Sequence, residues 1–409
     1  MAEKIFNVLL VLYPVTNIYG VGVQGISLGK LLLLISGFYL LCSRKTSLSF
    51  PKRYGAFAIW VFVVPFFYVF SSWTDINGIL YKSIGLLIFV LIVGFSCRFI
   101  IKEYCIKYFR RLALTFTVFF YLQYFVNLFT GIKILGIIPG LPLADATSID
   151  SYVAMQSMLT RYCSVFLEPS HFAVYISMYL ALKIKLLEGK IWNKEVIFIF
   201  IALLLLQSGN GYICIMAIGF GYILVNWRRI LFDVKRLITV LFCVCALLFI
   251  FQSASSSETF SETFNRMEEI SSEGDQNSSG FTRIFRGFYY FSDLSLLEKC
   301  VGIGQGNEDA YAKTHSLLSF RNLETYTDAV YLNGIQQILV YGGFIGCILF
   351  LFFLCQYYRS KDTILLVLPF TCLFFISGVY NSSIMLLYIV FLEMIRRNGL
   401  NNLVFRYKR

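Results

Sequence analysis

The chain has 409 residues, of which 58% are hydrophobic and only 14% are charged, and its mean hydropathy is +0.72. Soluble domains carry about 25% charged residues, so this composition excludes a soluble globular domain and predicts an all-α polytopic membrane protein. The formal net charge of +12 comes from basic loops between apolar segments, and it indicates membrane topology and not a nucleic-acid partner.

Apolar segments long enough to form helices across the hydrocarbon core recur along the chain. Two apolar runs are interrupted by polar stretches, "QSGNGY" at 207–212 and "SGVYNSS" at 377–383. One helix over the 34 residues from Lys194 to Trp227 would extend about 51 Å, so we expect a hairpin at each break. The twelve predicted spans are 5–22, 26–42, 54–72, 79–97, 112–130, 170–187, 194–208, 211–227, 237–252, 330–354, 363–378 and 381–395.

Basic residues predict the orientation of these spans, since lysine and arginine favour the cytoplasmic side of short loops. With twelve spans, Lys4 and six basic loops share one face and hold 25 of the 35 Lys and Arg residues. Both termini are therefore expected in the cytoplasm. The six basic loops are 44–53, 98–111, 183–194, 228–236, 359–361 and 396–409.

Two external segments divide the chain into five regions. An N-terminal five-helix transmembrane region, 1–130, precedes an external segment, 131–169, that leads into an apolar helix. Central transmembrane helices, 170–252, are followed by the largest external loop, 253–328. A C-terminal region, 329–409, contains three transmembrane helices and a cytoplasmic tail.

The stretch "RYCSVFLEPSHFA" at 161–173 gathers polar side chains at the start of a predicted helix. Pro169 suits the first turn of a helix, and the N-terminus of a helix favours anions. Arg161 can hold a phosphate through its planar guanidinium group, and Glu168 and His171 flank the proline. Alternatively, Arg161 binds lipid headgroups or pairs with Glu168, and His171 caps the helix.

The second external loop contains further candidates. Arg283 and Arg286 are three residues apart, so on a helix both lie on one face; the alternative is a surface that contacts lipid headgroups. "GIGQGN" at 302–307 is typical of a turn. His315 lies in a polar stretch, and Asp328 lies where the loop returns to the membrane.

Together these two segments supply arginines, histidines and carboxylates beside apolar helices, with no His/Cys pattern for a metal and no nucleotide-binding loop. A lipid-linked diphosphate sugar donor fits this set of groups. Arginines can neutralise a leaving diphosphate without a metal or other cofactor, while a carboxylate or histidine accepts the proton of the acceptor hydroxyl.

Three stretches resemble a known family. "RYCSVFLEPSHFA" is similar to the arginine-to-EPSHFA segment of O-antigen and capsule polymerases of the Wzy type. "FTRIFRGFYYFSDLSLLEKCVGIGQGN" resembles the arginine-aromatic helix and glycine motif of the wider O-antigen polymerase and ligase superfamily, and "VYLNGIQQILVYGGFIGCILFLFF" resembles its closing segment. The matches occur in the order expected for the family.

The resemblance implies a metal-independent, inverting glycosyltransferase of the GT-C type in the bacterial inner membrane. Such an enzyme joins undecaprenyl-diphosphate-linked oligosaccharide repeats on the periplasmic face, with a chain-length regulator protein as a candidate partner. By this analogy Arg161 and Arg283 bind the diphosphate, assisted by Arg286. Glu168 and His171 shape the acceptor site.

One departure bears on the activity within the superfamily. Ligases carry a His-Asn pair before the closing helix, whereas this chain reads "YTDAVYLN" there, which disfavours a ligase. Asp328, Glu168 and His315 remain as candidate bases. A polysaccharide flippase or other transporter is the main alternative, because twelve spans with both termini inside also describe transporters, although the two halves of this chain are dissimilar.

Overall fold

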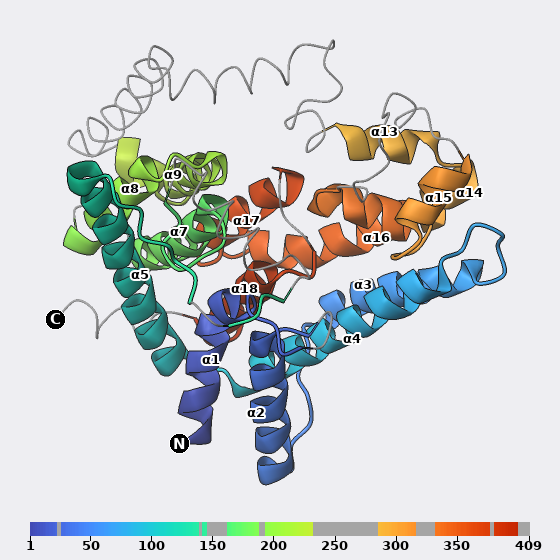
Figure 1. Ribbon diagram of the computed structural model, residues 1–409, viewed down its shortest axis with the longest axis horizontal. Coiled ribbons are helices and arrows are strands. Elements are labelled where there is room, and N and C mark those ends of the chain that lie inside the picture. Colours follow the sequence, from blue (N-terminus) through green and yellow to red (C-terminus); the bar gives the residue numbers. More distant parts are fainter. Residues whose placement is uncertain are drawn as a thin grey trace.

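The computed structural model describes residues 1–22, 26–138, 141–144, 162–187, 193–231, 285–315, 332–376 and 380–399. Within these ranges the elements are helices, and β-type pairing is limited to isolated bridges such as that between Tyr19 and Leu143. The helices, labelled as in Figure 1, are α1 (Ala2–Thr16), α2 (Leu28–Arg44), α3 (Lys52–Val63), the 3-10 helix η1 (Val64–Tyr68), α4 (Ile76–Phe99), α5 (Lys102–Thr130), α7 (Pro169–Leu186), α8 (Lys194–Leu205), α9 (Gly209–Leu231), α13 (Arg286–Asp293), α14 (Leu296–Val301), α15 (Glu308–His315), α16 (Gly334–Tyr358), α17 (Ile364–Ile376) and α18 (Ser383–Asn398).

The helices follow the apolar segments of the sequence. Each range predicted to span the membrane contains a helix, except 237–252, which lies outside the described residues. Both polar breaks separate helices, as predicted: α8 ends at Leu205 before α9 begins at Gly209, and α17 ends at Ile376 before α18 begins at Ser383.

Within the described residues, α4, α5, α9 and α16 are long and apolar enough to cross a membrane. α4 has 24 residues and α5 has 29, so they extend about 36 and 43 Å and exceed a hydrocarbon core about 30 Å thick. α8 and α17, with 12 and 13 residues, reach only about 18 to 20 Å. The part of the chain that the structure describes is therefore helical, with several helices suited to a membrane, and the total of twelve spans stays a prediction.

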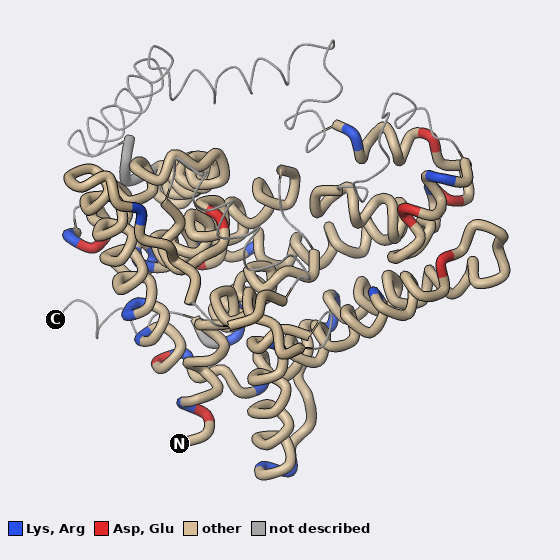
Figure 2. Tube along the Cα trace, in the orientation of Figure 1, with Lys and Arg blue, Asp and Glu red and all other residues tan. Residues whose placement is uncertain are grey.

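The outer side of α5 shows why these helices suit lipid. Val118, Leu122, Phe125 and Phe129 recur every three or four residues, and all four are exposed. In water such a continuous apolar stripe would be an aggregation liability, whereas facing hydrocarbon it requires no cover. Long stretches of the helices likewise carry no charged residue (Figure 2).

One apolar core contains residues from α1 through α18, and α7 lies deep within it. α7 contacts α5, α8, α9, α17 and α18, and every residue from Phe172 to Ile184 is buried. The Tyr175 hydroxyl donates a hydrogen bond of 3.1 Å to the carbonyl of Val11 on α1. α3 also packs on α16, and α4 on α18, so the N-terminal and C-terminal regions share this core.

The basic loops predicted to share the cytoplasmic face contact one another. Lys183 at the end of α7 lies 2.9 Å from Glu195 at the start of α8, and Glu195 also pairs with Arg110 of α5. Lys185 lies 2.6 Å from Asp362, between α16 and α17. These ion pairs gather the ends of five helices, as a common face requires, while the orientation of that face in a membrane stays a prediction.

Candidate functional site

The polar residues at the start of α7 lie together. Glu168 is the extended residue before the helix, and Pro169 occupies the first helical position. The Ser170 hydroxyl donates a hydrogen bond of 2.9 Å to the half-buried Glu168 carboxylate, while His171 is exposed. The Glu168 side chain does not cap this helix start, and no cap from another described side chain is seen. The first turn of α7 therefore presents an acid, a histidine and a positive helix end.

A buried glutamine on α5 fixes the segment that precedes α7. Gln123 is 1% exposed, and its amide nitrogen donates to the carbonyls of Ile134 (3.0 Å) and Ser164 (3.2 Å). Its amide oxygen accepts from the Ser164 backbone N–H at 2.9 Å. Ser164 has a φ of +55°, and its hydroxyl donates to the Phe116 carbonyl at 2.7 Å. Gln123 thus holds the backbone that positions Glu168, a role the sequence reasoning missed.

The Glu168 carboxylate also affects a neighbouring thiol. Cys163 is 5% exposed, and burial, followed by the negative charge of Glu168, raises its pKa to about 12. The Cys163 thiol therefore stays protonated and unreactive at neutral pH.

Arg286 and His315 belong to a second group of helices, α13–α15, which packs on α16. Arg286 is the first residue of α13 and is half-buried. The His315 ring stacks on the Tyr311 ring at 3.9 Å between centroids, and its Nδ1 lies 3.1 Å from the Tyr311 carbonyl. Burial, followed by the Glu298 carboxylate that accepts from its hydroxyl, raises the pKa of Tyr311.

The glycine motif docks this second group onto the helix bundle. Gly302, Gly304 and Gly306 all have positive φ, at +89°, +79° and +90°. The N–H of Gly304 donates to the Tyr341 carbonyl of α16 at 3.1 Å, just before a kink at Gly343, where φ is +63°. Methyl groups on the three motif glycines would overlap the backbones of α16, η1 and α4 respectively. The motif is therefore a close backbone contact between helices.

Three buried polar residues of the motif and its flank sit beneath this contact: Gln305, Asn307 and Glu308. The Glu308 carboxylate accepts hydrogen bonds from the Tyr341 hydroxyl (3.0 Å) and the Gly306 N–H (2.7 Å). The Lys82 ammonium group lies 3.7 Å from the same carboxylate. In the sequence, the only indication of this buried polar cluster is the polar residues that follow the glycines in "GIGQGNED".

The structure places the predicted residues that it describes in two groups, on different helices. Glu168 and His171 lie at α7, whereas Arg286 and His315 lie with α13–α15, and α16 and α17 lie between the two groups (Figure 1). Arg161, Arg283 and Asp328 lie outside the described residues. Among the described residues, no three His, Cys, Asp or Glu side chains come together as a metal site would require.

The described helices define a class, that of helical proteins with apolar helices able to cross a membrane. Comparison of the chain with protein-family models, curated proteins and solved structures gives no match.

Proposed function

We propose that this protein polymerises undecaprenyl-diphosphate-linked oligosaccharide repeats into O-antigen or capsular polysaccharide. The observation that carries the proposal is the first turn of α7, where Glu168 and His171 lie together at an uncapped helix start within the stretch that resembles the polymerases. Both residues are accessible from solvent, as a group that meets an incoming sugar must be.

The proposed reaction is an inverting glycosyl transfer. The acceptor hydroxyl oxygen attacks the anomeric carbon of the donor repeat, and the bond between that carbon and the diphosphate oxygen breaks. The undecaprenyl diphosphate leaves with the bonding electrons, and the acceptor proton passes to a base. Glu168 or His171 is the first candidate base, with His315 and Asp328 as alternatives, while Arg161, Arg283 and Arg286 stabilise the diphosphate charge.

The proposal is tested by the surface polysaccharide of a strain that lacks the protein. Loss of a polymerase should leave single repeats displayed on the cell surface, whereas loss of a flippase should trap repeats on the cytoplasmic side. Complementation with Arg161→Ala or Arg283→Ala should fail to restore long chains, because the leaving diphosphate loses a cation.

A matched arginine variant separates loss of function from loss of protein. Arg111 is exposed on α5 within a basic loop predicted to be cytoplasmic, so Arg111→Ala should restore long chains at an equal amount of membrane protein on an immunoblot. Normal chain length in the Arg161 and Arg283 variants would refute their assignment. Repeats trapped on the cytoplasmic side of the deletion strain would show that the protein is a transporter and not a polymerase.

A further inference from the structure

A basic pocket lies among the ends of α3, α16 and α18. Its volume is about 620 Å³, within the range of pockets that bind small molecules. The residues lining it are Ser49, Phe50, Lys52, Arg53, Gln356, Arg359, Arg396 and Arg397. All of them except Gln356, on α16, come from three of the loops predicted to be cytoplasmic, so segments far apart in the sequence build one site.

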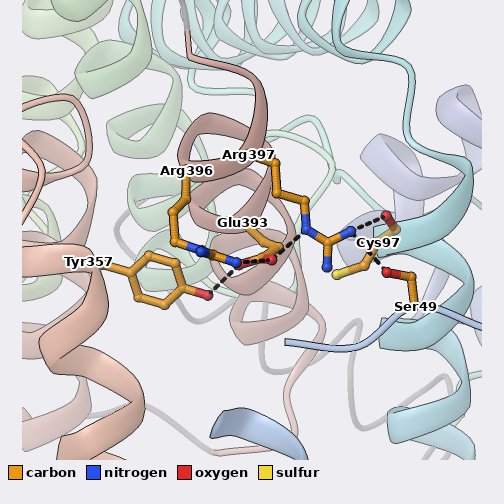
Figure 3. A network of polar contacts seen from close by, with 6 residues as sticks. All are labelled: Ser49, Cys97, Tyr357, Glu393, Arg396 and Arg397. Carbon is orange, nitrogen blue, oxygen red and sulfur yellow. Dashed lines mark hydrogen bonds and ion pairs between the residues drawn. The ribbon is translucent and has the colours of Figure 1, made fainter. Parts of the chain in front are cut away.

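Five of the lining residues are cationic, and one buried carboxylate serves two of them. Glu393 is 1% exposed and lies 2.7 Å from Arg396 and 2.5 Å from Arg397 (Figure 3). The Tyr357 hydroxyl also donates to Glu393, at 3.1 Å. Arg397 further donates to the Ser49 hydroxyl at 2.9 Å. These contacts hold the two guanidinium groups at the pocket. Because both guanidinium groups pair with the Glu393 carboxylate, Glu393 does not neutralise the other three cations of the pocket.

The remaining three cations have no carboxylate partner among the described residues. The Arg53 guanidinium lies over the Phe352 ring, 4.0 Å from its centroid. Neither the Lys52 side chain nor the Arg359 side chain forms a hydrogen bond or ion pair with another described residue, and both side chains are exposed. Like charges held around one cavity repel one another, so the pocket favours an anionic occupant.

A neutral donor at the pocket is also unsatisfied. Gln356 lines the pocket, and its Nε2 is buried with no hydrogen-bond partner among the described residues. A buried amide without a partner costs about 1–3 kcal/mol. An acceptor oxygen in the pocket would remove that cost.

We propose that this pocket binds a phosphate group. Arginines recognise phosphate through paired hydrogen bonds, and the five cations exceed what a single carboxylate needs. The phosphate belongs either to an anionic phospholipid headgroup or to a soluble phosphate. Exposed Leu351 and Phe352 lie on α16 about two turns before Arg359, and they place an apolar surface beside the pocket, as a phospholipid requires.

This site is separate from the first turn of α7. Lys185, near the end of α7, pairs with Asp362, three residues after Arg359. α7 has 18 residues and rises about 27 Å, so Glu168 lies at the opposite end of that helix. The phosphate pocket therefore does not depend on the proposed polymerase activity.

The test compares binding to the full-length protein, purified in uncharged detergent, of phosphatidylglycerol, phosphatidylcholine and inorganic phosphate. The pocket variant is Lys52→Gln with Arg359→Gln. The matched control is Lys107→Gln with Arg111→Gln, which removes one lysine and one arginine from exposed positions on α5. Thermal unfolding of each variant checks the fold. The charge-conserving variant Lys52→Arg with Arg359→Lys tests whether positive charge at these two positions is sufficient for binding.

Wild-type protein should bind phosphatidylglycerol more tightly than phosphatidylcholine, or bind inorganic phosphate. The pocket variant should bind the same anion about thirtyfold more weakly, equivalent to about 2 kcal/mol, while the α5 control and the charge-conserving variant bind normally. Phosphatidylglycerol binding that phosphate does not displace identifies a lipid site, and displacement identifies a soluble phosphate site. Equal binding by the pocket variant and the control, or binding of neither anion, would overturn the proposal.

Discussion

Substitution of Gly304 by alanine should destabilise the protein, because the glycine motif is a close contact between backbones. Gly304 has a φ of +79°, and a Cβ atom there would overlap the backbone of Pro65 in η1. A side chain in the left-handed region costs about 1–2 kcal/mol, and overpacking adds about 1–3 kcal/mol. The expected loss of about 2–5 kcal/mol is a large part of the stability of a typical protein.

Unfolding of the full-length protein in mixed micelles, titrated with a denaturing detergent, measures this loss. Gly219→Ala is the matched control, since Gly219 is exposed within α9 and a Cβ there would meet nothing within 4 Å. The control should unfold at the wild-type midpoint or slightly above it. A wild-type midpoint for Gly304→Ala would refute the docking of the glycine motif between α16 and η1.

Three further predictions concern the site and the ends of the helices. Gln123→Leu removes three hydrogen bonds to the backbone before α7, so it should lower the free energy of unfolding by about 2–4 kcal/mol and abolish long polysaccharide chains. Polysaccharide of normal length would show that another contact positions α7. Glu195→Ala should cost about 3–5 kcal/mol by micelle titration, since Lys183 loses its carboxylate in a site where its side chain is 6% exposed, and an unchanged midpoint would contradict this. A membrane-impermeant maleimide should label the exposed Cys300 in intact spheroplasts. It should not label Cys163, which is buried and has its pKa raised to about 12 by burial. Labelling of Cys300 only after permeabilisation would contradict the predicted orientation.

The helical architecture could be predicted from the sequence because it depends on local patterns. Apolar stretches set where helices form, and the polar stretches 207–212 and 377–383 end them. The charge pattern also predicted which loops share one face, and ion pairs such as that of Lys185 with Asp362 join those loops. The lengths of the helices were less predictable, since α8 and α17 are too short to cross the hydrocarbon core alone.

The contacts that build the site could not be predicted, because they join residues distant in the sequence. Gln123 resembles any polar residue in an apolar helix until it is seen to bind Ser164, 41 residues later. The sequence predicts a turn at "GIGQGN", and its alternating glycines do form irregular backbone. Their positive φ values, however, allow the close approach of α16, η1 and α4. The sequence does not indicate the role of Glu308, because its partner Tyr341 lies 33 residues later, on α16.

Reconstitution tests the proposed polymerase activity most directly. The purified protein in proteoliposomes would receive undecaprenyl-diphosphate-linked repeats extracted from a strain that lacks it, and the products would be resolved by length. We predict a ladder of lipid-linked chains longer than one repeat, formed without added nucleotide and lost in Arg161→Ala. Repeats that remain single, or that only move across the bilayer, would contradict the proposal.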